Sequence, residues 1–149
     1  MRERAYGYFC TPFMEQRLRI GVLGAGHLGR IHTQQAREVP ELQVAGIYDP
    51  HPEKRDAVAA EFGVPAFTNM DALIAASDLV DVVTPTLAHH ACAKAALLSG
   101  KHVYIEKPVT NTLDEARELA ALAKERRLQV QVGHVERFNP ALQAALPAL

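Results

Sequence analysis

A short glycine-rich segment constrains the fold of this chain more than any other feature. Gly24, Gly26 and Gly29 form the pattern G-x-G-x-x-G directly after the apolar run 18–23. The residues from 27 to 38 contain few β-branched side chains and end before a proline, which predicts a helix. An apolar strand that enters a glycine turn and continues as a helix is typical of the start of a β-α-β unit.

The rest of the chain repeats this alternation of apolar runs and helical segments. We predict strands at 18–23, 42–48, 66–67, 79–84, 102–105 and 129–133. We predict helices at 27–38, 52–62, 71–76, 88–99 and 112–126, and a new helical segment from residue 139. Strands that alternate with helices pair in parallel through right-handed crossovers. The sequence therefore predicts an α/β fold with a doubly wound, mostly parallel sheet of the Rossmann type.

The composition argues against several classes of partner. The 149 residues include 16 Lys and Arg against 17 Asp and Glu, so no basic surface for nucleic acid or an anionic membrane is expected. No apolar stretch approaches the roughly 18 residues that a membrane span needs. Two cysteines, Cys10 and Cys92, are too few for a disulfide framework. This usage favours a reducing compartment, and we expect a cytoplasmic protein.

The glycine spacing suits a bound pyrophosphate. Gly24 permits the tight turn, Gly26 lets the backbone approach the pyrophosphate, and Gly29 allows the helix to pack on the strand. The helix N-terminus offers free N–H groups and a partial positive charge to the anion. Asp49 follows the second predicted strand, where a carboxylate accepts hydrogen bonds from an adenosine ribose. The two features together predict a dinucleotide site.

Alternatives to this interpretation stay open at this point. The glycine turn can serve packing alone, or belong to an S-adenosylmethionine-binding domain, because those folds also use a glycine turn and an acidic residue after the second strand. The chain can also be a stand-alone dinucleotide-sensing module without chemistry of its own. Asp49 favours NAD over NADP, because a carboxylate repels a 2′-phosphate. Lys54 and Arg55 are the counter-argument, since cationic side chains there suit that phosphate.

Two further motifs follow predicted strand ends, where open parallel sheets place their ligand crevice. The first is TPTLAH at residues 84–89, whose threonines offer hydroxyl groups and whose proline fixes the turn. The second is GKHVYIEKP at residues 100–108. Lys107 lies next to the expected nicotinamide region, where a lysine can donate a hydrogen bond to a substrate hydroxyl or carbonyl, and can assist proton transfer if burial lowers its pKa. It is the candidate catalytic residue.

These segments together resemble the glucose-fructose oxidoreductase, inositol dehydrogenase and rhizopine catabolism family, Gfo/Idh/MocA. GAGHLGRIH at 24–32 is similar to the family's opening, and PTLAH at 85–89 and GKHVYIEKP at 100–108 are similar to its two later signatures. VGHVERFNP at 132–140 is similar to the segment that leads out of the family's nucleotide domain. The resemblance runs from about residue 18 to the C-terminus, and the Glu-Lys-Pro run is its most specific part.

The resemblance implies hydride transfer between NAD, or NADP as the second choice, and a hydroxyl or carbonyl group of a sugar, cyclitol or sugar nucleotide. It implies a pyrophosphate and adenosine-ribose site formed by Gly24, Gly26, His27, Leu28 and Asp49. It implies a cofactor crevice lined by Thr84, Pro85, Thr86 and His89, with Glu106 and Lys107 near the nicotinamide ribose and the substrate. Family members often have a cis Lys-Pro peptide bond, which implies the same for Lys107-Pro108.

Family enzymes also carry a second α+β domain, which provides the substrate pocket, an Asp/His pair and a sheet used for oligomerisation. We therefore expect an N-terminal extension at 1–17, a dinucleotide-binding domain at 18–135 and a truncated connecting helix at 136–149. Such a chain is expected to bind cofactor but to turn over weakly or not at all, and to be able to form a homo-oligomer through exposed apolar surface. The segment 1–13 is expected to be an upstream start or a loose leader, since it lacks the features of a secretory signal.

The remaining polar residues predict no metal site, because the seven histidines are not spaced with cysteines or carboxylates as ligands are. His32 is expected to pack or hydrogen-bond behind the glycine turn. Asp81 interrupts an apolar run and is expected to be a hydrogen-bonded structural carboxylate. His134 follows a strand end and suits either substrate contact or structure. Cys92 is expected to be a small core residue and not a nucleophile.

Overall fold

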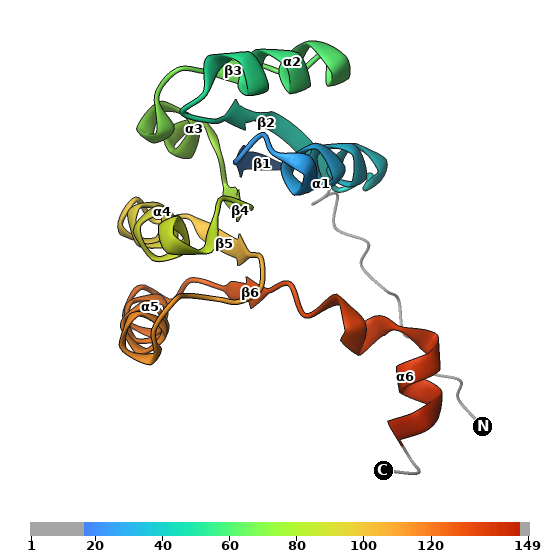
Figure 1. The fold of residues 1–149 in the computed structure, drawn as a ribbon. Coiled ribbons are helices and arrows are strands. Elements are labelled where there is room, and N and C mark those ends of the chain that lie inside the picture. The colour runs from blue at the N-terminus through green and yellow to red at the C-terminus, as the bar shows by residue number, and fades with distance from the viewer. Residues whose placement is uncertain (1–16, 147–149) are drawn as a thin grey trace, which may run out of the picture.

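A single sheet of six parallel strands organises the domain (Figure 1). The computed structural model describes residues 17–146, so the predicted leader at 1–13 lies outside the described residues. In chain order the strands are β1 (Leu18–Leu23), β2 (Leu42–Tyr48), β3 (Ala66–Phe67), β4 (Leu79–Val82), β5 (His102–Ile105) and β6 (Val130–Val132). They lie in the order β3-β2-β1-β4-β5-β6, and every neighbouring pair is parallel. The predicted doubly wound parallel sheet is confirmed.

Helices cover both faces of this sheet. In chain order the helices of the described residues are α1 (His27–Glu38), α2 (Pro52–Phe62), α3 (Met70–Ala76), α4 (Thr86–Leu98), α5 (Leu113–Arg126), the 3-10 helix η1 (Val135–Phe138) and α6 (Pro140–Ala145). In Figure 1, α4 and α5 lie side by side on one face, and α6 extends away from the sheet on the opposite side.

The two faces of the sheet pack two separate cores. Val80 and Val82 of β4 belong to the core under α3, α4 and α5, and both are fully buried. Since successive side chains of a strand alternate between faces, Asp81 between them points to the α1 side. Val22 and Ile47 belong to the second core, which packs against α2. Asp81 is thus a charged residue on the inner part of the sheet.

Local contacts confirm several predicted helix ends. The side chain of Asn69 accepts hydrogen bonds from two backbone N–H groups at the start of α3. Thr112 and Glu115 form a capping box at the start of α5, in which each side chain bonds the other residue's backbone. Gly63 and Gly100, which follow α2 and α4, adopt left-handed φ angles of 62° and 74°.

Several predicted boundaries are wrong. The start predicted for α3 at 71, the end predicted for α4 at 99 and the start predicted for α5 at 112 each differ by one residue. The strand predicted at 79–84 ends at Val82, and the helix predicted at 88–99 begins at Thr86. Pro85 accounts for both, because it cannot donate to a strand ladder and stands as the N-cap residue of α4 with φ −57°. The strand predicted at 129–133 covers Val130–Val132 only. The 3-10 helix η1 was not predicted, since its four residues carry no periodic apolar pattern.

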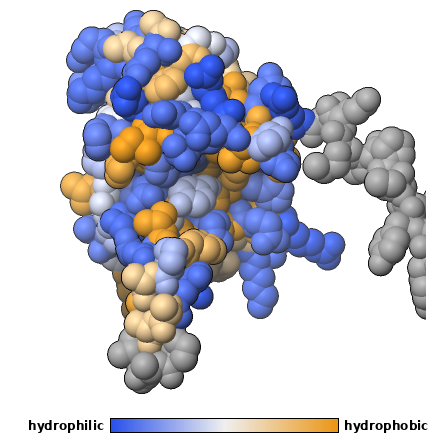
Figure 2. Space-filling view, turned by 90° about the vertical axis from the view of Figure 1, so that its right-hand side faces the viewer, coloured by the Kyte–Doolittle hydropathy of each residue, from blue (hydrophilic) through white to orange (hydrophobic). Residues whose placement is uncertain are grey.

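The segment from η1 onward exposes apolar side chains. Phe138 is 74% exposed and Leu146 is 55% exposed. The space-filling view shows apolar patches separated by polar residues on the side of the molecule that lies to the right in Figure 1 (Figure 2).

Candidate functional site

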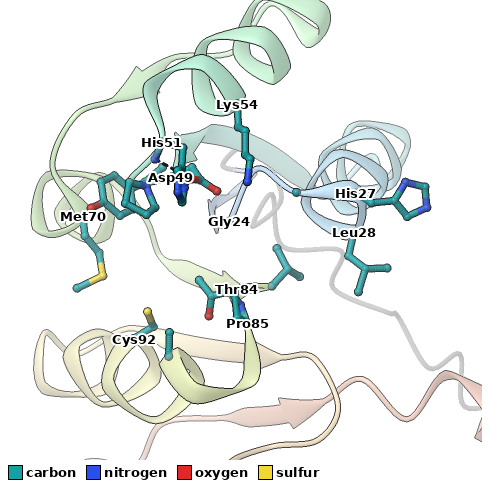
Figure 3. A pocket seen from close by; sticks show the side chains of 15 residues that line it. Gly24, His27, Leu28, Asp49, His51, Lys54, Met70, Thr84, Pro85 and Cys92 are labelled. Carbon is teal, nitrogen blue, oxygen red and sulfur yellow. Dashed lines mark hydrogen bonds and ion pairs between the residues drawn. The ribbon is translucent and has the colours of Figure 1, made fainter.

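A cleft of about 630 Å³ opens at the carboxyl ends of β1, β2 and β4 (Figure 3). It lies between the glycine turn after β1, the residues after β2 and the loop after β4. Its volume is within the range of roughly 300–1,000 Å³ that is usual for small-molecule sites. Because β1 stands between β2 and β4 in the sheet, successive connections diverge here. Open parallel sheets bind their ligands at such a point.

The glycine turn closes only because two of its glycines lack a side chain. Gly24 has a φ of +113°, and a Cβ there would lie 2.7 Å from the carbonyl oxygen of Val83. A Cβ on Gly29 would overlap the carbonyl oxygen of Gly24. Gly26 differs from both, because a Cβ there would meet nothing within 4 Å. The space beside Gly26 therefore belongs to the cleft, which this residue lines.

Helix α1 presents an uncapped N-terminus to this cleft. Its N-cap residue is Gly26, and no side chain hydrogen-bonds to the first turn. The first N–H groups of a helix have no partner within the helix and carry a partial positive charge. The backbone N–H of Gly24 donates to the carbonyl oxygen of Tyr48 at 2.8 Å, which fixes the turn to β2. This arrangement suits a phosphate group.

Asp49 is held beside the turn as a charged carboxylate. Its Oδ2 accepts from the backbone N–H of Ala25 at 2.8 Å, and its Oδ1 accepts from the backbone N–H of His51 at 2.9 Å. The ring Nδ1 of His51 lies 3.0 Å from the same Oδ1. Burial favours the protonated acid, but these hydrogen bonds together lower the pKa of Asp49. A carboxylate offers about four acceptor positions, so about one is left for a ligand hydroxyl.

The two cations weighed as phosphate ligands behave differently in the structure. Lys54 lines the cleft, and its side chain extends from α2 toward the glycine turn (Figure 3). Arg55 is buried, and its Nε donates to Asp56 at 2.7 Å. Only Lys54 of this pair therefore faces the site.

The loop after β4 forms the opposite wall. Thr84 and Pro85 line the cleft, and the Thr84 hydroxyl oxygen is buried without a hydrogen-bond partner among residues 17–146. Met70 and Cys92 complete this wall, and burial raises the pKa of the Cys92 thiol (Figure 3). The wall is mostly apolar.

His89 lies behind the wall and does not line the cleft. It is 1% exposed, and its ring nitrogens lie 2.8 Å from the carbonyl oxygen of Thr84 and 2.9 Å from that of Pro108. One imidazole thus joins the loop after β4 to the loop after β5. The Lys107-Pro108 peptide bond in the second loop is cis, as the family resemblance implies.

Glu106 and Lys107 follow β5 and also stand outside the cleft lining. Glu106 is 7% exposed, and its Oε2 accepts from the backbone N–H of Lys107 at 3.0 Å. The Lys107 side chain is exposed. His32 and Asp81 hydrogen-bond to each other at 2.9 Å, behind the glycine turn as predicted for His32.

The structure brings together most of the predicted cofactor residues. Those that line the cleft are Gly24, Gly26, His27, Leu28, Asp49, Thr84 and Pro85. Those that do not are Thr86, His89, Glu106 and Lys107. The roles assigned to all of them stay predictions.

Sequence reasoning missed several lining residues. His51 could have been found from its place two residues after Asp49, in the same strand-to-helix turn. Met70 and Cys92 carry no such signal, since tertiary packing of α3 and α4 alone brings them to the cleft.

Two other features are absent from residues 17–146. No group of three or more His, Cys, Asp or Glu side chains there is placed to hold a metal ion. Among the helices of the same residues, none combines the length and the apolar character that crossing a membrane requires.

Comparisons with known proteins agree with this site. The chain is 44% identical over 126 residues to UDP-N-acetylglucosamine 3-dehydrogenase of Acidithiobacillus ferrooxidans, a match that covers 85% of this chain and 40% of that protein. A solved structure of that enzyme superposes with a TM-score of 0.83 over 89% of this chain and 43% of the other, at 43% identity. The scyllo-inositol 2-dehydrogenase (NAD(+)) of Bacillus subtilis is 33% identical over 86% of this chain and 39% of its own length.

A further solved structure holds a cofactor. The crystal structure of GenD2 from gentamicin A biosynthesis, in complex with NAD, has a TM-score of 0.77 at 30% identity. The match covers 80% of this chain and 35% of that one. The chain thus spans about 40% of the length of the first relatives that it matches.

The sequence profile of the oxidoreductase family with an NAD-binding Rossmann fold matches residues 18–134. None of these comparisons supports an S-adenosylmethionine-binding domain or a stand-alone regulatory module. This chain belongs to the Gfo/Idh/MocA oxidoreductase family, and it is an NAD-binding Rossmann domain of that family.

Proposed function

We propose that this chain is the nucleotide-binding part of an oxidoreductase that acts on a hydroxyl or carbonyl group of a sugar, cyclitol or sugar nucleotide. The observation that carries the proposal is Asp49, a charged carboxylate fixed beside the glycine turn in a cleft of suitable size. The names of the relatives support the substrate class, since they include a sugar-nucleotide dehydrogenase and an inositol dehydrogenase.

The residues present fit a nicotinamide dinucleotide. The open space beside Gly26 and the uncapped start of α1 suit the pyrophosphate, and Asp49 suits the adenosine ribose. When bound, the cofactor supplies hydride transfer at its nicotinamide ring, and the protein supplies orientation and proton handling. In our proposal Lys107 handles the proton at the substrate oxygen.

We propose NAD as the preferred cofactor over NADP. The lowered pKa of Asp49 keeps a negative charge where the 2′-phosphate of NADP would lie. Lys54 favours the phosphate from the same cleft, so the preference depends on both groups. We also propose that the dinucleotide-binding domain runs from residue 18 to residue 135. A homo-oligomer and a cytoplasmic location belong to the same proposal.

Calorimetric titration with NADH tests the proposed cofactor site. Asp49→Ala is expected to weaken NADH binding by about tenfold or more, because a hydrogen bond to a charged group is lost. Glu53→Ala is the matched control, since it removes an exposed carboxylate near the same cleft that does not line it. Wild-type protein is expected to bind NADPH more weakly than NADH. In Asp49→Ala the difference between the two affinities is expected to be smaller.

Two outcomes of this titration would contradict different parts of the proposal. If Asp49→Ala binds NADH as tightly as wild type does, Asp49 is not part of the site. If wild-type protein binds neither coenzyme, the proposed function is wrong.

A further inference from the structure

Three ionisable side chains meet on the α1 face of the sheet, outside the cleft. His32 comes from α1, Asp81 from β4 and Glu106 from the turn after β5. Nδ1 of His32 lies 2.9 Å from Oδ2 of Asp81, and Nε2 lies 3.5 Å from Oε1 of Glu106. The two carboxylates thus contact different nitrogens of one ring. The ring of Tyr104 packs edge-on against His32, with 5.9 Å between centroids.

The surroundings of this cluster favour a positive charge on His32. Asp81 is 3% exposed and Glu106 is 7% exposed, so water screens neither carboxylate well. Both ring nitrogens face a carboxylate oxygen, and both can donate only when the imidazole is protonated. The hydrogen bond to Asp81 raises the pKa of His32 against the effect of burial, and the Glu106 charge raises it further. Burial raises the pKa of Asp81, and the hydrogen bond to His32 opposes this effect. The ring thus stands between two buried carboxyl groups.

The Glu106 carboxylate is also fixed from its other sides. Its Oε2 accepts the hydrogen bond from the backbone N–H of Lys107. A Cβ on Gly133 would lie 2.6 Å from Oε1 of Glu106 and 2.8 Å from the hydroxyl of Tyr104. The backbone after β6 therefore closes around this carboxylate, and its position fixes the start of the turn that carries Lys107.

The sheet order places this turn on one half of the cofactor site. Asp49 follows β2, the glycine turn follows β1, and Glu106 follows β5 on the far side of β4. A dinucleotide whose adenosine ribose lies at Asp49 and whose pyrophosphate lies at the start of α1 extends toward β4 and β5. Glu106 and Lys107 therefore stand toward the nicotinamide half, away from the adenosine half.

We propose that His32 is a positioning residue for the nicotinamide half of the site. It ties α1, whose N-terminus faces the pyrophosphate, to Glu106 and thus to the turn that carries Lys107. The inference rests on the proposed function, since it assumes a dinucleotide in the cleft. It predicts that His32 affects the nicotinamide half of the ligand and leaves the ADP-ribose half largely unaffected.

Comparison of NADH with ADP-ribose tests this prediction for the nicotinamide ring, because ADP-ribose lacks only that ring and keeps the adenosine, the pyrophosphate and the second ribose. His32→Gln is expected to lower NADH affinity by about tenfold and ADP-ribose affinity by less than about twofold. His90→Gln is the matched control, since it breaks a similar histidine–carboxylate pair, with Glu118 at 2.7 Å, on α4 and α5. Asp49→Ala is expected to lower the affinities for NADH and ADP-ribose by the same factor.

A second measurement needs no substitution. In wild-type protein the ratio of NADH to ADP-ribose affinity is expected to fall as the pH rises through the raised pKa of His32. Asp81, Glu106 and Tyr104 are the titratable groups that face His32. The histidines that line the cleft lie beside the half that both ligands share, so their effect cancels in the ratio.

Equal losses of NADH and ADP-ribose affinity in His32→Gln, or a ratio that does not change with pH in wild type, would overturn the role of His32. Either result leaves the proposed function intact when wild-type protein binds both ligands. Wild-type protein that binds neither NADH nor ADP-ribose contradicts the proposed function itself.

Discussion

The glycines of the turn after β1 differ in what surrounds them, and this difference separates stability from binding. Gly29→Ala is expected to destabilise the fold by about 1–3 kcal/mol, because its Cβ would overlap a backbone oxygen that cannot move away easily. Gly26→Ala is expected to leave the free energy of unfolding within about 0.5 kcal/mol of wild type, since its Cβ meets nothing and its φ of −74° suits alanine.

The two variants also separate in ligand binding. Gly26→Ala is expected to weaken NADH binding, because the added methyl group projects into the space that suits the pyrophosphate. Urea denaturation and NADH titration of both variants check the pair. A stable Gly29→Ala, or a Gly26→Ala that binds NADH like wild type, would contradict the assignment.

At His32 the expected pH dependence follows from its raised pKa. A histidine whose pKa is higher in the folded state adds stability that is fully present below its ordinary value of 6.5. This contribution is lost as the pH rises through the folded-state pKa. The difference in unfolding free energy between wild type and His32→Gln should therefore shrink as the pH is raised from below 6.5 through the folded-state pKa of His32. If the difference in unfolding free energy grows over this range, folding does not raise the pKa of His32.

Among the elements, β1 and the start of β4 are joined by a charged pair that acid should break. Arg19 donates to Asp78 from its backbone N–H at 3.0 Å and from its guanidinium at 2.7 Å. The Arg19 side chain lowers the pKa of Asp78 to about 2. Because this value lies below the ordinary 3.8, the stabilisation is present above pH 3.8 and is lost as the pH falls through about 2.

Acid titration of Asp78→Asn checks this pair. The variant is expected to be less stable than wild type near neutral pH and to converge with it in strong acid. Asp114→Asn is the control, since Asp114 is 92% exposed in its side chain and pairs with Arg117 within one helix. Parallel stability curves for wild type and Asp78→Asn down to about pH 2 would exclude the proposed contribution.

The elements also show how far sequence reasoning reaches. The apolar runs 18–23, 42–48 and 102–105 coincide with strands, because burial on both faces leaves a continuous apolar signal. Around Pro85 the apolar run continued past the end of the strand, so hydropathy alone misplaced the boundary. The contact of His32 with Glu106 joins residues far apart in the chain, and no local pattern predicts it.

For the whole molecule, ligand binding should appear as added stability. A ligand that binds only the folded state at a hundredfold excess over its Kd contributes about 2.7 kcal/mol. For a chain of this size, NADH should then raise the Tm by roughly 5–11 °C. S-adenosylmethionine should leave the Tm unchanged. NADH at the same concentration should raise the Tm of Asp49→Ala only about half as much, because a tenfold weaker Kd leaves about 1.4 kcal/mol of added stability. If S-adenosylmethionine raises the Tm and NADH does not, this chain does not bind the nicotinamide cofactor of its family.

Catalytic turnover belongs to the whole molecule as well. The chain spans about 40% of the length of the relatives that it matches, and we expect it to bind cofactor with little or no turnover. A steady-state assay with NAD and a panel of sugars, cyclitols and sugar nucleotides checks this. Robust turnover of any of them by the 149-residue chain would refute the expectation.

His89 contacts two loops of the domain, the one after β4 and the one after β5. Because one buried imidazole lies within hydrogen-bond distance of carbonyl groups of both Thr84 and Pro108, it connects the loop after β4 with the turn that carries Lys107. A substitution of His89 is therefore expected to disturb the proposed coenzyme wall and the proposed catalytic turn together.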